Sequence, residues 1–510
     1  MKRLLAILAL LLPATAHAEW YEATTPHVRV FAKGKEAEAR RIADQIERFD
    51  SALRYLRETP EREGGPAGRL TIYVVDSFAE VDRLTKGANV AGFYLPRAGG
   101  SVAFVPQRAP GGDKLALSEE AVLLHEYTHH FMYRNYTAAH PPWLAEGFAE
   151  FHATARFHDD GSVQIGAPPP YRIRGLFYRV QLPIQRLLEP KDVKITWQEL
   201  DNLYGRGWLL LHYLTFEKTR AQQLAEYLRA MAEGKPSLEA ARLAFGDLKT
   251  LDRELAAYTR KQLVEVQIPA TALKPGSISV RRLTAPEEAM MEVHIVSTSD
   301  VDRKQARKLL PKVRKAAQPY PDHPFVQAVM AKAEFDAGNF NEAKAAADRS
   351  VAADPKSRNG LLYQSMAMTQ LALASEDRSP QTKRATRAPL LAANRLDPDD
   401  PRPMLLIYEN HRAFGDTPGP DVVKAIQYAH RMAPEDHDLR LTAASEHLRA
   451  GEVSRARALV APLVYDAHAG RQEAATALLA LIDAHGTEAA DATAGAADTP
   501  KVGADEVVNP

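Results

Sequence analysis

The chain has 510 residues, which is enough for two or three domains that each bury a hydrophobic core. Hydrophobic residues make up 45% and charged residues 25% of the sequence, as in ordinary soluble globular proteins. Lys plus Arg and Asp plus Glu both number 65, so no excess of basic charge points to nucleic acid or anionic lipid as a partner.

Residues 1–18 are typical of a secretory signal peptide. Lys2 and Arg3 precede the apolar run Leu4–Leu12, which is too short to span a bilayer because a spanning helix needs about 20 residues. The segment ends in A-H-A, an A-x-A cleavage pattern. We therefore expect an exported chain, periplasmic or secreted, with no integral membrane segment after signal removal; the alternative is a buried N-terminal helix. Because the sequence contains no Cys, its stability must come from packing rather than from disulfides.

Residues 19–262 mix strand and helix patterns and predict an α+β domain. β-branched and apolar runs at Val28–Phe31 and Leu70–Val75 predict strands. Apolar residues recur at helical spacing over Glu36–Leu56 and predict an amphipathic helix. An exposed strand is expected at Ser101–Val105. Further helices are expected at 118–136, 142–156, 205–218 and 220–233.

Residues 263–298 are rich in Pro, Thr and Val and predict a short β-rich connector. From 299 to 484 the chain is Ala-rich with a helical pattern. Prolines recur there at spacings of 34, 43 and 36 residues, at Pro321, Pro355, Pro398 and Pro434. This period resembles that of tetratricopeptide repeats, whose helix pairs stack because neither helix can bury its apolar face alone. An Ala-rich bundle without true repeats is the alternative. Residues 485–510 lack periodicity and are expected to form a disordered tail.

The segment His125–His129 reads H-E-Y-T-H, an H-E-x-x-H motif within a predicted helix. Ser118 is a suitable N-cap for that helix, and residues four apart lie on the same helix face. His125 and His129 can therefore present two imidazole nitrogens to one cation, and neutral imidazole is a preferred ligand of Zn²⁺. Glu126 points to one side, where it can act on a water molecule instead of binding the metal. Taken alone, the motif is also compatible with a solvated pair of histidines.

A second motif, W-L-A-E-G-F-A-E at Trp143–Glu150, begins behind two prolines that favour the start of a helix. A catalytic zinc site commonly combines two His with one carboxylate and leaves the fourth position for water. Glu146, 17 residues after His129, is the natural third ligand. Glu150 lies one helical turn further along, where it can accept the N–H of a ligand imidazole and so fix its tautomer.

Together the two motifs resemble those of the gluzincin metallopeptidases, the group that includes thermolysin and the aminopeptidase N family. Within that group the sequence is most similar to bacterial peptidase-like proteins that begin with a T-P-H-hydrophobic strand, here Thr25–Val30. The resemblance covers residues 19–262 and implies a gluzincin-like α+β zincin domain with one catalytic Zn²⁺ per chain. It implies that the zinc ligands are His125, His129 and Glu146. It also implies that Glu126 is the general base.

The resemblance also bears on the substrate. Aminopeptidases of this group carry a G-x-M-E-N strand whose Glu holds the free amine of the substrate. The corresponding strand here, Gly99–Phe104, contains no acidic residue, which favours an endopeptidase. Tyr204 and Gly207 resemble the Y-x-x-G that opens a helix in aminopeptidase N relatives, where the Tyr stabilises the transition state. Arg206 is a second possible donor, and a Tyr that merely packs at a helix start is the alternative.

The sequence therefore predicts zinc-dependent hydrolysis of peptide bonds by a metal-activated water, with peptides or proteins as substrates. The repeats are a possible binding site for a protein partner. The alternative, from a different class of function, is a catalytically weak or inactive zincin-fold scaffold that acts through its repeats. Other histidines are expected to be core or surface residues rather than metal ligands: His130, His140, His152 and His212.

Overall fold

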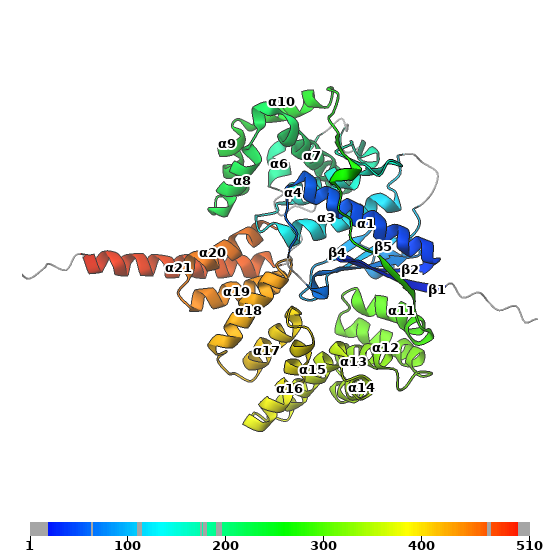
Figure 1. Cartoon of the computed structure of the whole chain (residues 1–510). Coiled ribbons are helices and arrows are strands. Elements are labelled where there is room, and N and C mark those ends of the chain that lie inside the picture. The colour runs from blue at the N-terminus through cyan, green and yellow to red at the C-terminus, as the bar shows by residue number, and fades with distance from the viewer. Residues whose placement is uncertain are drawn as a thin grey trace, which may run out of the picture.

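The computed structural model describes residues 19–62, 65–109, 115–173, 176, 181–189, 196–466 and 471–497. The predicted signal peptide, residues 1–18, lies outside this part of the chain. The chain folds into an N-terminal domain of mixed helices and strands, followed by helix pairs that curve beneath it (Figure 1).

A six-stranded sheet, in the order β4-β5-β3-β2-β1-β9, forms the centre of the N-terminal domain among the described residues. Its strands are β1 (Glu19–Thr24), β2 (Val28–Gly34), β3 (Leu70–Val75), β4 (Phe93–Leu95), β5 (Val102–Pro106) and β9 (Ser279–Arg282). β3 runs parallel to its neighbours β2 and β5, whereas β4 and β9 are antiparallel strands at the two edges. The two strands predicted around Val30 and Ile72 are confirmed.

The strand expected at Ser101–Val105 is present as β5, but the prediction that it is exposed is wrong. All five residues of β5 are buried, since its side chains alternate between the cores on the two faces of the sheet and β4 pairs with its outer edge. The flanking Gly99 and Gly100 suggested exposure, whereas in the folded chain Gly99 lies against the helical repeats. The edge strand on this side of the sheet is therefore β4.

Helices cover both faces of the sheet. On one face lie α1 (Glu36–Leu56) and α3 (Glu119–Asn135), which share the main hydrophobic core with β2, β3 and β5. The bounds of α1 are those that the sequence predicted, and its apolar stripe is buried. The other face is covered by α2 (Phe78–Leu84) and by α11 (Ala285–Thr298), the first helix of the repeats. The repeats therefore complete the core of the N-terminal domain.

Shorter elements complete the N-terminal domain. They are α4 (Pro142–Ala153), β6 (Arg156–Phe157), β7 (Val163–Ile165), α6 (Ile184–Leu188), α7 (Trp197–Phe216), α8 (Gln223–Ala232), α9 (Ser237–Phe245), α10 (Leu248–Tyr258) and β8 (Val266–Ile268). β6, β7 and β8 form a second, antiparallel sheet. The β-rich connector predicted at 263–298 holds strands only as far as Arg282, since α11 occupies its second half.

The predicted helical repeats are confirmed as consecutive helix pairs. Their helices are α11, α12 (Arg303–Ala317), α13 (Pro324–Ala337), α14 (Phe340–Ala353), α15 (Arg358–Ala374), α16 (Pro380–Leu396), α17 (Pro401–Ala413), α18 (Pro420–Met432), α19 (His437–Arg449) and α20 (Val453–Val460). A single longer helix, α21 (Gln472–Ala497), follows and leaves the body of the molecule (Figure 1). It replaces the first part of the disordered tail predicted from 485, and residues 498–510 lie outside the described part.

Small residues lie at the turn and the crossing of two helix pairs, α13–α14 and α19–α20. Gly338 and Gly451 have φ of 88° and 74°, and each ends the first helix of a pair in the left-handed conformation that glycine adopts readily. The alanines five positions later, Ala343 and Ala456, are fully buried where the two helices cross. The periodic prolines follow the second helix of a pair, where they prevent the helix from continuing.

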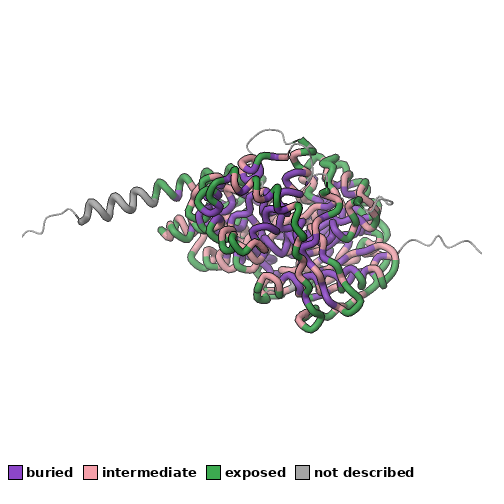
Figure 2. The backbone as a smooth tube through the Cα atoms, turned by 90° about the horizontal axis from the view of Figure 1, so that it is seen from above, coloured by how far each residue is buried: buried purple, intermediate pink, exposed green. Residues whose placement is uncertain are grey.

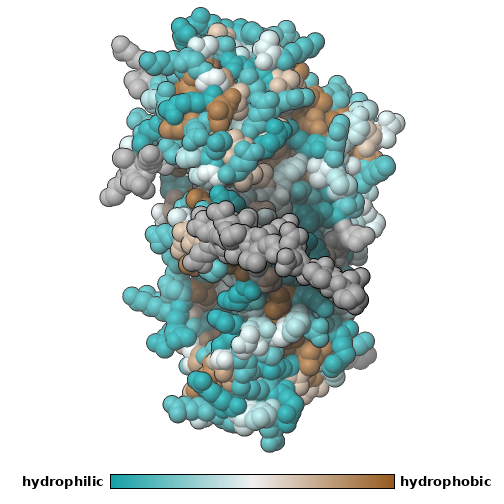
Figure 3. Space-filling model, turned by 90° about the vertical axis from the view of Figure 1, so that its left-hand side faces the viewer, coloured by the Kyte–Doolittle hydropathy of each residue, from teal (hydrophilic) through white to brown (hydrophobic). Residues whose placement is uncertain are grey.

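Buried segments run through the interior of the molecule and exposed segments lie around its outside (Figure 2). Figure 3 views a face on which hydrophilic side chains predominate, both over α8–α10 at the top and over the repeats at the bottom. In the described part of the chain, no helix combines the length and the hydrophobicity that crossing a membrane requires.

Candidate metal centre

Helix α3 carries the H-E-x-x-H motif, and its start is fixed locally. The hydroxyl of Ser118 accepts a hydrogen bond from the backbone N–H of Ala121 at 3.1 Å, which confirms the predicted N-cap. His125 and His129 follow on one face, one helical turn apart. The motif therefore lies in the middle of a capped, almost entirely buried helix, which gives its side chains fixed positions.

Helix α4 supplies the carboxylates, and a close backbone approach to α7 sets its position. A Cβ on Gly147 would lie 2.4 Å from the carbonyl oxygen of Gly207, and a Cβ on Gly207 would lie 2.5 Å from the carbonyl oxygen of Trp143. Only glycine permits helices to cross at such a distance. This crossing places Glu146, next to Gly147, beside Tyr204, which lies one turn before Gly207 on α7.

The structure brings the three predicted ligands together. The Nε2 atoms of His125 and His129 are 3.1 Å apart, and Glu146 Oε2 lies 3.3 Å from the first and 3.8 Å from the second. In a tetrahedral site with ligands at about 2.0–2.1 Å from zinc, ligand atoms are separated by about 3.3 Å. The donor set and its spacing therefore fit Zn²⁺ without rearrangement of the backbone.

The surroundings of His125 favour a positive charge. Burial acts to lower the pKa of this imidazole, but the hydrogen bond with Glu146 and the charges of Glu150 and Glu126 outweigh burial and raise the pKa. Three carboxylates therefore converge on a histidine that is largely removed from solvent. Such a cluster is stable when a cation lies among the carboxylates.

Glu126 is positioned by α3 on one side and by the sheet edge on the other. A Cβ on Gly92, the residue before β4, would lie 3.1 Å from Glu126 Oε1, so the carboxylate lies beside the start of that strand. Glu126 is 7% exposed. Its charge contributes to the raised pKa of both His125 and Tyr204, which places it at the site that the ligands form.

Glu150 lies behind His125, as the sequence predicted. Its Oε1 is 3.6 Å from Nδ1 of His125, the nitrogen that faces away from the ligand cluster. Arg172, at the end of the short 3₁₀ helix Pro170–Arg172, donates to the same oxygen from Nε at 3.0 Å and from Nη2 at 2.8 Å. Arg172 Nη1 also donates to Asp201 on α7 at 3.3 Å. Sequence analysis missed Arg172 and Asp201, which lie outside both motifs.

We expect Glu150→Gln to weaken zinc affinity about 10-fold to 100-fold, because the carboxylate behind His125 is lost and Arg172 loses its ion pair with Glu150. Competition with a fluorescent zinc chelator measures this change. Glu199→Gln serves as a control, since Glu199 also pairs with an arginine, Arg186, but away from the ligands. An unchanged zinc affinity in Glu150→Gln would show that Glu150 does not orient the ligand.

Tyr204 lies at the site, but the predicted helix start at this residue is wrong. Helix α7 begins at Trp197, where Thr196 and Glu199 form a capping box, so Tyr204 is in its interior. Its ring stacks on that of His125 at a centroid distance of 6.0 Å, and the Arg172 guanidinium lies 4.4 Å from its ring centroid. Burial and the charge of Glu146 raise the pKa of Tyr204 well above 10, so its hydroxyl remains a proton donor.

Arg206, the second possible donor, does not face the ligands. Its guanidinium donates to the carbonyl oxygen of Leu182 and pairs with Asp252. Of the two candidate donors, Tyr204 is therefore the one that the structure places beside the candidate metal ligands.

The four other histidines that the sequence singled out are core residues, in line with the expectation that they are not metal ligands. His130 and His152 are buried, and burial holds the pKa of each imidazole well below 6.5. His152 Nε2 accepts from Arg57, and His130 Nδ1 lies 3.3 Å from the hydroxyl of Tyr94. His140 and His212 are also buried, away from the ligand cluster.

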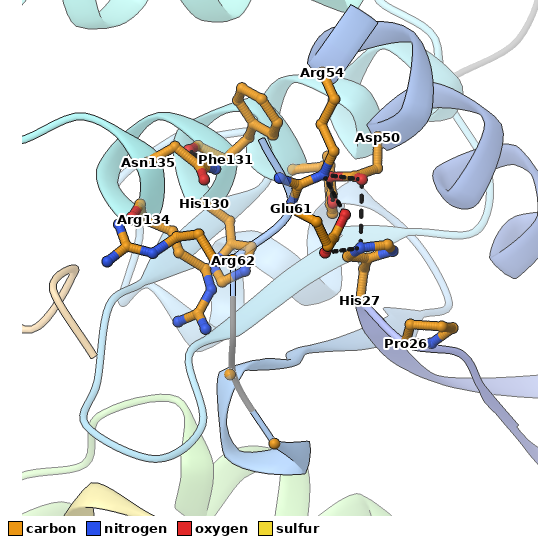
Figure 4. Close-up of a pocket in the computed structure, with 13 residues that line it drawn as sticks. Pro26, His27, Asp50, Arg54, Glu61, Arg62, His130, Phe131, Arg134 and Asn135 are labelled. Carbon is orange, nitrogen blue, oxygen red and sulfur yellow. Dashed lines mark hydrogen bonds and ion pairs between the residues drawn. The ribbon is translucent and has the colours of Figure 1, made fainter. Parts of the chain in front are cut away.

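A second cluster, His27 with Asp50 and Glu61, also brings possible metal-ligand atoms within 4.8 Å of one another. It lies beside a cavity of about 40 Å³ (Figure 4). The guanidinium of Arg54 contacts both carboxylates there, at 2.6 Å from Asp50 and 3.1 Å from Glu61. Because the chain supplies its own cation, we interpret this cluster as an ion-pair network that joins β2 to α1.

The charge of His27 stabilises this network. Its Nδ1 lies 2.9 Å from Glu47 Oε2, and its Nε2 lies 2.9 Å from Glu61 Oε1. Burial acts to lower the pKa of His27, but Glu47, Asp50 and Glu61 raise it to about 9. A folded-state pKa above the unfolded value of about 6.5 stabilises the fold fully below pH 6.5, and this contribution is lost as the pH rises through 9.

We therefore expect His27→Gln to lower the free energy of unfolding by about 1–3 kcal/mol at pH 6 and by much less at pH 10. Urea unfolding of both proteins at the two pH values measures the difference. An equal loss at pH 6 and pH 10 would show that the charge of His27 does not contribute.

No family model matches the chain, and no curated protein matches it. Among similar solved structures is TTC0263, a thermophilic TPR protein in Thermus thermophilus, at 18% identity and a TM-score of 0.32, covering 39% of this chain and 98% of that one. MamA is 12% identical with a TM-score of 0.27, covering 36% and 95% of the two chains. MamA 41-end from Desulfovibrio magneticus RS-1 is 12% identical with a TM-score of 0.25, covering 39% and 97%.

Proposed function

We propose that this chain is an exported zinc metallopeptidase with a gluzincin-like catalytic domain and one Zn²⁺ per chain. The observation that carries the proposal is the convergence of His125, His129 and Glu146 at separations suited to tetrahedral zinc. Two His and one carboxylate leave a fourth position open, which distinguishes catalytic from structural zinc sites. Export, to the periplasm or the medium, is supported by the signal-peptide pattern of residues 1–18.

When bound at these ligands, zinc would act as a Lewis acid: it would lower the pKa of a bound water molecule to about 7 and polarise the peptide carbonyl. The chain's own groups move the protons. Glu126 takes a proton from the attacking water at its carboxylate and delivers it to the nitrogen of the leaving amine. Tyr204 donates a hydrogen bond to the carbonyl oxygen as that oxygen gains negative charge.

The substrate of this mechanism is an extended peptide. β4 is the edge strand beside Glu126, so its free backbone groups can pair with a peptide by strand addition. The segment 90–95 that contains β4 has no acidic residue to hold a free amine. This supports an endopeptidase over an aminopeptidase, although the strand concerned is β4 rather than the predicted Gly99–Phe104.

The helical repeats support a second role, the binding of a protein partner on surfaces that the N-terminal domain leaves uncovered. The rival function, a scaffold with little or no turnover, shares the repeats but requires neither Glu126 nor metal. The two proposals therefore differ in what the zinc site does.

Cleavage of a peptide library by the mature protein tests the proposed function. The unchanged protein should cut internal bonds, lose this activity to a zinc chelator, and regain it when zinc is added. Glu126→Gln should give no cleavage pattern above background. If the two proteins give the same pattern, or if neither cleaves, the scaffold explains the chain better than the peptidase.

A further inference from the structure

The turn between β4 and β5 projects from the catalytic domain into the helical repeats. We define residues 96–101 as the hairpin tip. Figure 1 shows β4 and β5 above the curved row of helix pairs, with the turn directed towards them. The tip contacts two of these helices: Gly99 lies against α17, and Ala98 is bonded to the start of α19.

The firmest contact joins Ala98 to the start of α19. The backbone N–H of Ala98 donates to Asp436 Oδ2 at 2.5 Å, while Oδ1 of the same carboxylate accepts from the N–H of Leu439 at 2.8 Å and caps α19. The Ala98 side chain packs against the hydrophobic cluster of α17, α18 and α19. One partly buried carboxylate therefore serves both the helix and the hairpin.

The backbone of the tip also lies close to the repeats at Gly99. This residue has φ of 72°, and a Cβ there would lie 2.5 Å from Cγ of Arg402 on α17. Arg402 is itself held by an ion pair with Asp400 at 2.6 Å and by a hydrogen bond to Asn359 at 2.9 Å. No larger residue fits here without displacing a fixed side chain.

The tip is closed on itself by a bond between Arg97 and Ser101. The backbone N–H of Arg97 donates to the hydroxyl of Ser101 at 3.2 Å. Burial lowers the pKa of the Arg97 guanidinium, whereas the charges of Asp300 and Asp336 and the hydroxyl of Tyr363 act in the opposite direction.

The repeats also hold the far end of α3. Arg134 pairs with the buried Glu435 at 3.1 Å, and the hydroxyl of Tyr133 donates to Asp466 at 2.9 Å. Both residues follow His129 on the same helix. Both α3, which carries Glu126, and β4, which lies beside it, are therefore attached to the C-terminal repeats.

We propose that the repeats help to position the substrate: α17 and the start of α19 bind the hairpin tip and thereby fix β4 as the strand on which the substrate backbone lies. The partner of this surface of the repeats is therefore the chain's own hairpin. The inference rests on the proposed peptidase function for its substrate, but the contact between tip and repeats is independent of zinc. Asp436 is a positioning residue in this scheme, because it acts on the substrate through β4.

Asp436→Asn tests the proposal with minimal disturbance. Asparagine caps helices as well as aspartate does, so its single carbonyl oxygen can still accept from Leu439. Its amide group then faces the N–H of Ala98, and the contact with the tip is lost. Asp302→Asn is the matched control, because Asp302 caps α12 by a 2.8 Å bond from Gln305 and no bond joins it to the tip.

In Asp436→Asn we expect hydrogen exchange at residues 93–101 to become at least about 10-fold faster, since the Ala98 N–H loses its acceptor. KM for a peptide should rise about 10-fold to 100-fold with kcat nearly unchanged, because β4 contacts ground state and transition state alike. Bound zinc should remain the same. The control should show neither change.

Gly99→Ala provides a second variant, with Gly415→Ala as its control. Both glycines have φ above 70°, but a Cβ on Gly415 would meet no atom within 4 Å. Gly99→Ala should therefore reproduce the faster exchange and higher KM, and Gly415→Ala should not. Exchange that stays slow in both test variants would overturn the proposed contact.

Faster exchange with an unchanged KM would overturn the role of the repeats in positioning the substrate through β4. If the unchanged protein binds zinc but cleaves no peptide, the proposed function fails, and with it the role of β4 in binding substrate. The exchange measurement would still decide whether Asp436 holds the tip, so the two failures are distinguishable.

Discussion

Glu126→Gln should retain one zinc per chain, whereas its rate of peptide hydrolysis should fall by about 10²-fold to 10⁴-fold. This is the usual contribution of a general base. Glutamine preserves the shape of the side chain, and Glu126 is not among the three ligands, so the metal site should be unchanged. Only the ability to accept a proton is removed. The rate of hydrolysis of a chosen internally quenched peptide, measured at saturating zinc, gives the effect.

Glu120→Gln is the matched control on the same helix, because Glu120 lies in its first turn and pairs with Gln45. Its hydrolysis rate should match that of the unchanged protein. If Glu126→Gln and Glu120→Gln hydrolyse the peptide equally fast, Glu126 is not the base and the assignment of the site's chemistry is wrong.

Tyr204→Phe should lower kcat by about 10²-fold to 10³-fold, the cost of removing one hydrogen-bond donor from a developing oxyanion. The ring should keep its place, because it stacks on His125 and lies under Arg172. Zinc content and thermal stability should therefore be unchanged, which separates this variant from one that disturbs the ligands.

Tyr213→Phe removes a hydroxyl from the same helix, where it bonds to Glu254 at 3.1 Å away from the metal ligands. Its kcat should stay within about 2-fold of the unchanged value, whereas a loss of 10²-fold corresponds to about 2.7 kcal/mol of transition-state stabilisation. Equal kcat values for Tyr204→Phe and the unchanged protein would leave Tyr204 with a packing role only.

The cluster of candidate metal ligands could be predicted from the sequence because each motif lies on one locally specified helix. Ser118 caps α3 through its own hydroxyl, and the i, i+4 spacing places His125 and His129 on one face. The orientation of Glu146 towards them depends on the crossing of α4 and α7. Its sequence signal was the glycine beside Glu146, whose role becomes evident only when Gly207 is seen against it.

The start of α7 was misplaced because Tyr204 and Gly207 resemble a Y-x-x-G that opens a helix. Glycine lowers helix propensity by about 1 kcal/mol relative to alanine, so Gly205 and Gly207 gave no sign that the helix had already begun. The capping box at Thr196 and Glu199 was the better signal for the true start. Gly207 is retained inside the helix because α4 approaches its backbone.

Contacts between distant segments could not be predicted from single motifs. Arg172 reaches Glu150 from a short 3₁₀ helix that has no motif of its own. The residues of α11 were assigned to a connector because 263–298 is rich in Pro, Thr and Val, although α11 covers one face of the sheet. The contact of Ala98 with Asp436 joins residues 338 positions apart. In each case the partner is chosen by the tertiary packing.

The zinc content of the purified mature protein, measured by elemental analysis beside His129→Ala, tests the central claim most directly. The account predicts about one zinc per chain in the unchanged protein and none in the variant, with the helical circular dichroism of both alike. His129 supplies one of three ligand atoms, and two remaining ligands hold zinc too weakly to survive purification. A protein without zinc after exposure to the metal, or a His129→Ala variant that keeps it, would contradict the account.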